Sequence, residues 1–209
     1  MKLAIFGATG GTGRQLVAQA LARGDELTVL ARDPAKLARS DPRLHVVTGD
    51  VHDAEVVGET VAGADAVLSA LGHRRGSGRH VLTTGAQLIV AAMNEAGVRR
   101  LVVLSITAVR DPHDRPRTIE RLMEGVGHVL AGGVYADHLG QATVVQAADL
   151  DWTIVRAPLL TNGPHTGHYH VGSLGGGMGG RISRADVADF MLKQAADATH
   201  VRQVPLVGS

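Results

Sequence analysis

A glycine- and threonine-rich segment near the start of the chain contains the residue types that hold phosphate groups. Its sequence, Gly7-Ala-Thr-Gly-Gly-Thr-Gly13, follows a short apolar run and precedes an amphipathic one. Glycines permit a tight turn and a close approach of the backbone, and the first amides of a helix offer free N–H groups to an anion. Between a strand and a helix the pattern favours a dinucleotide site over an ordinary glycine turn. The expected ligands are Gly7, Thr9, Gly10, Gly11, Thr12 and Gly13.

The residue after the second apolar run bears on the choice of dinucleotide. NAD-preferring Rossmann proteins usually carry an acidic residue there, but Val29-Leu30-Ala31 is followed by Arg32. A guanidinium at this point favours a 2′-phosphate, and Lys36 can add a second cation. Asp33 comes one position late for a ribose ligand and is a candidate cap for a helix at Pro34. The sequence therefore predicts NADP(H), with a surface arginine as the alternative for Arg32.

A carboxylate follows the third apolar run, in the segment Gly49-Asp50-Val51. Asp50 and Val51 are expected at the adenine, whose amino group can donate to the carboxylate. A turn or a helix cap is an equal alternative for Asp50.

The elements that position these residues follow from alternation along the chain. Short apolar runs recur at 3–6, 27–30, 44–47, 66–68, 101–104, 152–155 and 204–207, with helical patterns between them, as at 12–23 and 89–96. Gly24 and Gly97 stand where C-terminal caps belong. This alternation predicts an α/β, Rossmann-type, doubly wound parallel sheet with small C-terminal elements on the substrate side.

Bulk composition narrows the function classes. A chain of 209 residues without a linker-like tract is interpreted as one domain spanning 1–209. With 21 basic and 20 acidic side chains we expect no nucleic-acid partner. The absence of cysteine excludes disulfides and thiol chemistry. No signal-like segment or membrane span is evident, so the expectation is a cytoplasmic protein. We further expect a monomer or homodimer that acts on a small-molecule acceptor.

Several further segments together resemble the atypical short-chain dehydrogenase/reductase group that includes biliverdin reductase B, also described as flavin reductase. The resemblance covers most of the chain and rests on motifs at 5–10, 28–34, 45–51, 65–68, 71–72, 104–105, 137–138, 151–158 and 182–188. Such relatives reduce flavins, and in the best-known case linear tetrapyrroles, with NADPH.

The resemblance also implies roles for individual residues. It places Leu71, Gly72, Arg74 and Pro158 along the cofactor, Ser105 beside the nicotinamide and His138 near it. Ser105 and His138 are thus the candidate catalytic residues. A strand-end serine bonded to local backbone and a solvated helix histidine are the alternatives. Where the family can carry a histidine after the proline, this chain has Leu159.

The segment between Ser105 and His138 is also longer than in the biliverdin reductase branch. Four apolar residues in it have helical spacing and predict a packed extra helix: Ile119, Leu122, Met123 and Val126.

The chain lacks the Tyr-x-x-x-Lys pair of other short-chain dehydrogenases. Its lysines are Lys2, Lys36 and Lys193, and none is expected near the carboxyl ends of the fifth and sixth strands. Hydride transfer to a planar conjugated acceptor, such as a flavin, a quinone or a tetrapyrrole-like molecule, needs mainly orientation. An NADPH-dependent reductase of this kind is the leading interpretation. The alternatives are a non-catalytic redox sensor resembling the NmrA regulators and a tailoring reductase of secondary metabolism.

Two late segments are candidates for other sites. The histidines at 165, 168 and 170 have a spacing that occurs by chance in loops, so we expect no metal there. The glycines of 175–180 lack the lysine of a phosphate loop and indicate a mobile flap or linker.

Overall fold

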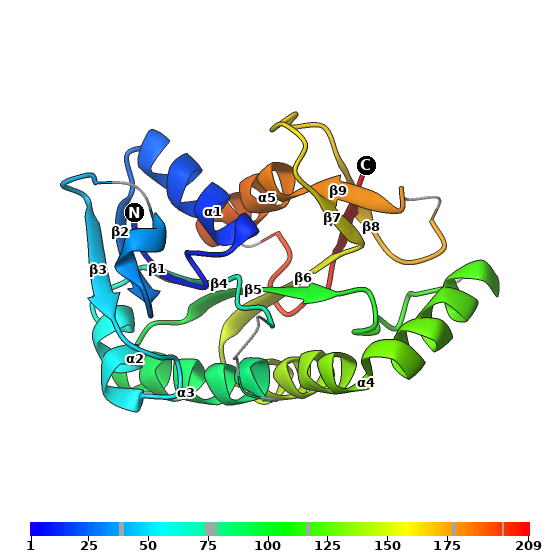
Figure 1. Ribbon diagram of the computed structural model, residues 1–209, viewed down its shortest axis with the longest axis horizontal. Helices are drawn as coiled ribbons and strands as arrows, with labels where there is room; N and C mark the ends of the chain where they lie inside the picture. Colours follow the sequence, from blue (N-terminus) through cyan, green and yellow to red (C-terminus); the bar gives the residue numbers. More distant parts are fainter. Residues whose placement is uncertain (38–39, 74–77, 79, 116–117, 177–178, 198) are drawn as a thin grey trace.

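The computed structural model describes residues 1–209 except 38–39, 74–77, 79, 116–117, 177–178 and 198, and it describes the backbone but not the side chains of 118–131. A mostly parallel sheet runs through the middle of the molecule (Figure 1). Its strands, in spatial order, are β3 (Leu44–Thr48), β2 (Glu26–Ala31), β1 (Lys2–Phe6), β4 (Ala66–Ser69), β5 (Arg100–Ile106), β6 (Asp151–Ala157), β10 (Leu206–Gly208) and β8 (His170–Gly172). A separate pair joins β7 (Leu159–Thr161) to β9 (Arg181–Ser183).

Helices cover both faces of this sheet. Helices α1 (Gly11–Ala22) and α5 (Arg184–Ala196) lie on one face, and α2 (Ala54–Val61), α3 (Val81–Ala96) and α4 (Thr118–Ala147) lie on the other (Figure 1). A short 3-10 helix, η1 (Pro34–Leu37), follows β2. Alternate side chains of each strand enter different cores, so Ile5 packs toward α1 and α5 while Phe6 packs toward α2 and α3. Both cores consist of apolar side chains, which fixes the register of the central strands.

The order of the strands creates a place for a ligand. The chain proceeds from β1 outward to β2 and β3, then returns to β4 on the other side of β1. The connections leaving β1 and β4 therefore diverge at the carboxyl edge of the sheet, and such a switch point is where open α/β sheets bind ligands. Gly7 follows β1 and Ala70 follows β4 at this point.

The doubly wound sheet predicted from the sequence is confirmed, with differences at its edges. The first six predicted apolar runs lie in strands, and the last, 204–207, only overlaps β10, which begins at Leu206. β8 pairs antiparallel with β10, and the β7–β9 pair was not anticipated. Gly24 and Gly97 take φ values of +88° and +69°, as expected of C-terminal caps.

Two helices differ in extent from the predictions. α3 begins at Val81, eight residues before the predicted start, because its first turns are capped from another helix rather than by a local signal. The predicted extra helix is the beginning of α4, one continuous helix of 30 residues. The side chains of its first turns lie outside the described part, so their packing stays a prediction.

A buried ion pair ties the carboxyl end of β6 to its surroundings. Arg156 is fully buried, and its guanidinium contacts both carboxylate oxygens of Asp114, with nitrogen-to-oxygen distances of 2.5 and 3.1 Å. The same guanidinium donates to the carbonyls of Val109 and Val204. Asp114 also accepts the N–H of Leu174, which anchors the start of the predicted glycine flap. One arginine thus links β6, the segment before β10 and two loops.

Among the residues that the structure describes, no helix combines the length and the apolar character needed to cross a bilayer.

Candidate functional site

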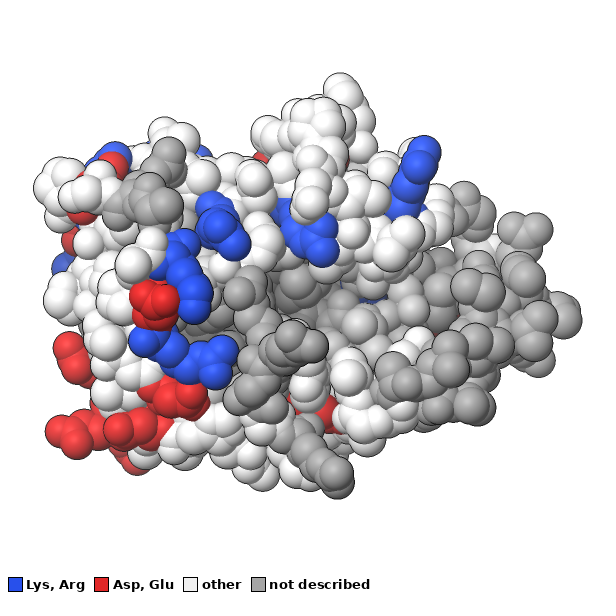
Figure 2. Space-filling view, viewed as in Figure 1, with Lys and Arg blue, Asp and Glu red and all other residues white. Residues whose placement is uncertain are grey.

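A cleft of about 390 Å³ opens at the carboxyl edge of the sheet, at the switch point. It runs from the ends of β2 and β3, past the glycine loop, to the ends of β5 and β6. Basic side chains gather on this face over the part that holds α1 and β2, near a hollow, with acidic side chains among them (Figure 2). Most of the predicted cofactor residues line the cleft: Gly7, Thr9, Gly10, Gly11, Thr12, Arg32, Asp50, Val51, Leu71, Gly72, Ser105 and Pro158.

The glycine loop has the shape of a phosphate seat. Gly7 has a φ of +78°, and a Cβ added there would lie 2.4 Å from the carbonyl oxygen of Ala70. A Cβ on Gly13 would lie 2.1 Å from the carbonyl oxygen of Gly7. Only glycine allows β1 and α1 to approach so closely. Gly10 precedes α1 without a side-chain cap, so the first amides of the helix are left for an anion in the cleft. These features fit a dinucleotide diphosphate.

The adenosine end of the cleft carries opposite charges. Arg32 lies 3.8 Å from the carboxylate of Asp50, and both side chains are about half exposed. Asp50 also accepts the backbone N–H of His52 at 3.0 Å. The same side chain therefore stabilises a local turn and lines the cleft. Burial raises the pKa of Asp50, but the contacts with His52 and Arg32 outweigh it and hold the pKa below its usual value. Because exposed pairs contribute only about 0–1 kcal/mol, Asp50 does not prevent Arg32 from binding a phosphate.

Three predicted cofactor residues are not among the lining residues. Lys36 extends to Asp33, with a nitrogen-to-oxygen distance of 3.0 Å, and Asp33 also accepts the N–H of Ala35 at the start of η1 as expected of a cap. Gly13 lies behind the loop and acts through close packing. Arg74 lies outside the described residues. Their contact with a cofactor stays a prediction.

The other end of the cleft contains a buried serine and histidine. Ser105 is the last residue but one of β5 and has 2% of its surface exposed, and its Oγ lies 3.2 Å from Nδ1 of His138 on α4. Burial, with a further contribution from His73, lowers the pKa of His138 to about 4. The ring is therefore neutral near pH 7. Depending on its tautomer, His138 accepts from Ser105 or donates to it, so the hydroxyl can either receive an amide N–H or donate to a carbonyl oxygen.

Asp137, the neighbour of His138, holds this region together. Its fully buried carboxylate accepts the backbone N–H groups of Leu82 and Thr83, both at 2.9 Å, and so caps α3 from α4. Nε2 of His73 lies 2.9 Å from the same carboxylate, at ion-pair distance but outside hydrogen-bond geometry. Burial raises the pKa of Asp137, yet the Thr83 hydroxyl, the two amides and His73 together lower it overall. Asp137 therefore stays ionised and fixes the helix that presents His138.

The lowered pKa of His138 predicts an acid-labile component of stability. The unfolded histidine binds a proton below pH 6.5, whereas the folded one does so only near pH 4. Stability is therefore lost as the pH falls from 6.5 toward 4, by about 2 kcal/mol at pH 4.5. Urea unfolding at pH 7 and at pH 4.5 measures the effect: between the two pH values, the free energy of unfolding of His138→Gln should fall by about 2 kcal/mol less than that of the wild type. The lowered carboxylate pKa values act in both proteins and cancel, so an equal loss would contradict the assignment.

Sequence reasoning missed two polar residues of the cleft. Arg184, at the start of α5, lies against the glycine loop, and His73 lies between Gly72 and Asp137. Leu159, where the family can carry a histidine, is 70% exposed and is not a lining residue. Arg184 itself belongs to the motif at 182–188, and His73 directly follows the motif at 71–72, which was the available signal for both.

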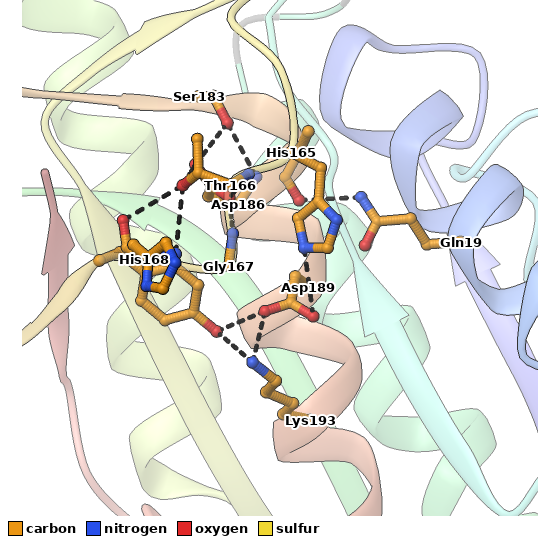
Figure 3. A network of polar contacts seen from close by, with 11 residues as sticks. Gln19, His165, Thr166, Gly167, His168, Ser183, Asp186, Asp189 and Lys193 are labelled. Atoms are coloured by element: carbon orange, nitrogen blue, oxygen red, sulfur yellow. Dashed lines mark hydrogen bonds and ion pairs between the residues drawn. The ribbon is translucent and has the colours of Figure 1, made fainter.

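A tyrosine and a lysine do meet in space, but away from the cleft. Nζ of Lys193 lies 3.1 Å from the hydroxyl of Tyr169, beside the carboxylate of Asp189 (Figure 3). Burial and the hydrogen bond to Asp189 raise the pKa of Tyr169 to about 12, against the opposite effect of Lys193. A catalytic tyrosine needs the reverse shift. This cluster therefore supports the loop over α5 rather than proton transfer.

The histidine loop is also held by α5. Asp186 accepts the N–H groups of Thr166 and Gly167 at 2.7 and 3.0 Å, and His165 lies 3.6 Å from Asp189 (Figure 3). Within the part of the chain that the structure describes, no three histidine or acidic side chains form a group that could hold a metal ion.

Comparisons with known proteins agree with this geometry. A family model described as NAD(P)H-binding matches residues 7–198. A chloroplastic protein of Arabidopsis thaliana is 29% identical over 188 residues, which are 80% of this chain and 62% of that protein. A (4-alkanoyl-5-oxo-2,5-dihydrofuran-3-yl)methyl phosphate reductase of Streptomyces griseus is 32% identical over 130 residues, which are 62% of this chain and 43% of that protein. The chain thus spans less than two thirds of the length of either relative.

Solved structures show the same fold at low identity. A short-chain dehydrogenase/reductase from Veillonella parvula in complex with NADP superposes with a TM-score of 0.79 at 21% identity, over 100% of this chain and 94% of that one. An anaerobillin reductase from Escherichia coli gives 0.80 at 21% identity, over 100% of this chain and 97% of that one. With a glycine cradle at the switch point of a Rossmann-type sheet and a family match over nearly its whole length, the chain belongs to the NAD(P)H-binding family.

Proposed function

We propose that this protein is an NADPH-dependent reductase that delivers hydride to a planar conjugated acceptor, such as a flavin, a quinone or a tetrapyrrole-like molecule. The single observation that carries the proposal is the order in which charged and polar groups follow one another along the cleft. It begins at an arginine suited to a 2′-phosphate, passes the glycine cradle, and ends at a buried serine beside a neutral histidine. The Streptomyces griseus relative and the Escherichia coli protein of the same fold are both named reductases.

The lining residues match a reaction that depends on orientation rather than on strong acid–base catalysis. Among the described lining residues there is neither a tyrosine nor a lysine, and the cleft histidine next to Ser105 is uncharged near neutral pH. A bound NADPH supplies the hydride; with one proton from water, the oxidised acceptor becomes the two-electron-reduced product and NADP⁺ remains. Ser105 orients a carboxamide or an acceptor oxygen, and the apolar Leu104, Ala157 and Leu160 limit water at that end.

The test is turnover with a panel of acceptors. NADPH absorbance is followed with purified protein and FMN, FAD or quinones. We expect the wild type to oxidise NADPH only when an acceptor is present. Ser105→Ala should lower this rate, while its coenzyme affinity, measured by calorimetry, stays within about 3-fold of the wild type. Absence of turnover with every acceptor, combined with equal affinity for NADP⁺ and NADPH, would instead support a redox sensor.

Arg32 should set the preference for NADPH. Arg32→Ala removes a charge-assisted contact to the 2′-phosphate, so NADPH affinity should fall about 10- to 100-fold, whereas NADH affinity should fall by less than about 3-fold. Calorimetric titrations of both coenzymes give the two values. Equal losses would show that Arg32 does not recognise the extra phosphate, and a parallel Lys36→Ala variant shows whether the second cation contributes.

A further inference from the structure

Arg184 reaches the glycine loop from the far end of the sequence. It is the first residue of α5, yet a Cβ added to Gly11 would lie 2.6 Å from its Cδ and 2.7 Å from its Nε. The arginine stem therefore crosses directly over the first residue of α1. Both Arg184 and Gly11 line the cleft, together with Gly10 and Thr12.

The guanidinium is held by one nitrogen and leaves others available. Nη1 donates to Oδ1 of Asn162 at 2.7 Å and to the carbonyl of Leu160 at 3.3 Å. In the described part of the chain, Nε and Nη2 have no hydrogen bond or ion pair. Among the described residues, no carboxylate forms an ion pair with Arg184, whereas Arg32 and Lys36 have Asp50 and Asp33 beside them.

The backbone that carries Arg184 is fixed on both sides. Ser183 caps α5, with its Oγ accepting the N–H of Asp186 at 2.9 Å, and Asp186 in turn holds the 166–167 turn (Figure 3). Gln19 on α1 donates to the carbonyl of Ala185 at 2.9 Å. These contacts attach the start of α5 to α1, so the guanidinium is pre-positioned at the N-terminus of α1 before a ligand arrives.

We infer that Arg184 is a ligand of the coenzyme diphosphate, which it contacts from the α5 side opposite the amides of the glycine loop. The inference rests on the coenzyme seat of the proposed function. A planar guanidinium with two available donor nitrogens matches phosphate oxygens, and the partial positive charge of the helix N-terminus attracts an anion to the same point. The diphosphate is common to all the dinucleotides, so Arg184 contributes affinity without distinguishing NADPH from NADH. It therefore complements Arg32, which discriminates between the two.

The first test is calorimetric titration of NADPH, NADP⁺ and NADH into the wild type and Arg184→Gln, with thermal melting to verify folding. We expect Arg184→Gln to weaken all three by about 10- to 100-fold and to leave the NADPH-to-NADH ratio within about 2-fold of the wild type. Arg99→Gln, an exposed arginine at the opposite edge of the sheet, should change nothing. A loss below 2-fold, or a loss confined to NADPH, would overturn the inference.

A second variant isolates the contact between the two residues. Gly11→Ala should push the flexible Arg184 side chain aside, because the new methyl occupies the position of its stem. If that displacement is the cause, Gly11→Ala weakens the coenzymes in the wild-type background but adds no more than about 2-fold in the Arg184→Gln background. Fully additive losses would overturn the inference. Wild-type protein that binds no coenzyme would overturn the proposed function as well, whereas wild-type binding with an unchanged Arg184→Gln would overturn the inference alone.

Discussion

Replacing Arg156 by methionine is expected to lower the free energy of unfolding by about 3–5 kcal/mol. The side chains of Arg156 and Asp114 are 0% and 3% exposed, and the arginine also satisfies two backbone carbonyls. Removal of the guanidinium leaves a buried carboxylate without its counter-charge, which costs far more than loss of an exposed pair. Urea unfolding monitored by circular dichroism gives the value.

The control removes the stranded charge as well. Asp114→Asn in the Arg156→Met background should recover part of the loss, because it removes the stranded charge while its amide oxygen can still accept one of the two N–H groups, those of Asp111 and Leu174, that contact the carboxylate. A loss below about 1 kcal/mol for Arg156→Met would show that the pair is solvated in solution. A double variant that is less stable than Arg156→Met alone would also contradict the argument.

Gly13→Ala should abolish measurable coenzyme binding, with affinity reduced by about 100-fold or more. The added Cβ would lie 2.1 Å from the carbonyl oxygen of Gly7 and 2.7 Å from Cα of Ala8, and both are backbone atoms that cannot rotate away. α1 must therefore move off the loop, and its first amides move with it. Calorimetry with NADPH measures the loss, and circular dichroism verifies that the sheet persists.

Gly58→Ala provides the matched control for that substitution. Gly58 lies inside α2, has nothing within 4 Å of an added Cβ, and does not require a positive φ. Alanine there should stabilise the protein by about 0.5–1 kcal/mol and leave coenzyme affinity unchanged. If Gly13→Ala behaved like Gly58→Ala, close packing between β1 and α1 would not be what shapes the phosphate seat.

The parts of the site that the sequence predicted are those set by local order. The glycine loop, Arg32 and Asp50 all follow strands whose apolar runs are evident, and parallel strands present their carboxyl ends at one edge. Ser105 and His138 came from the family resemblance, and the structure adds their contact and the burial of the histidine. The sheet was predictable for the same reason, since β1 to β6 are nearly continuous apolar segments.

The parts that escaped prediction depend on contacts between distant segments. Arg184 meets Gly11 only because α1 and α5 pack side by side on one face, and no periodicity in either helix reveals this. The early start of α3 depends on Asp137, more than fifty positions away in the chain. The short strands β7, β8 and β9 contain three residues each, too few for an alternating pattern to distinguish them from loop.

The cap that Asp137 on α4 provides for α3 also determines which part of α4 can change in length. The described side-chain contacts of Asp137 and His138 anchor the second half of α4, and the first turns of this helix extend past the edge of the sheet (Figure 1). Insertions or deletions among those early turns would leave the anchor in register. A change of length in that projecting arm should therefore leave the seat of the dinucleotide in place, because Asp137 still caps α3 from the same position on α4.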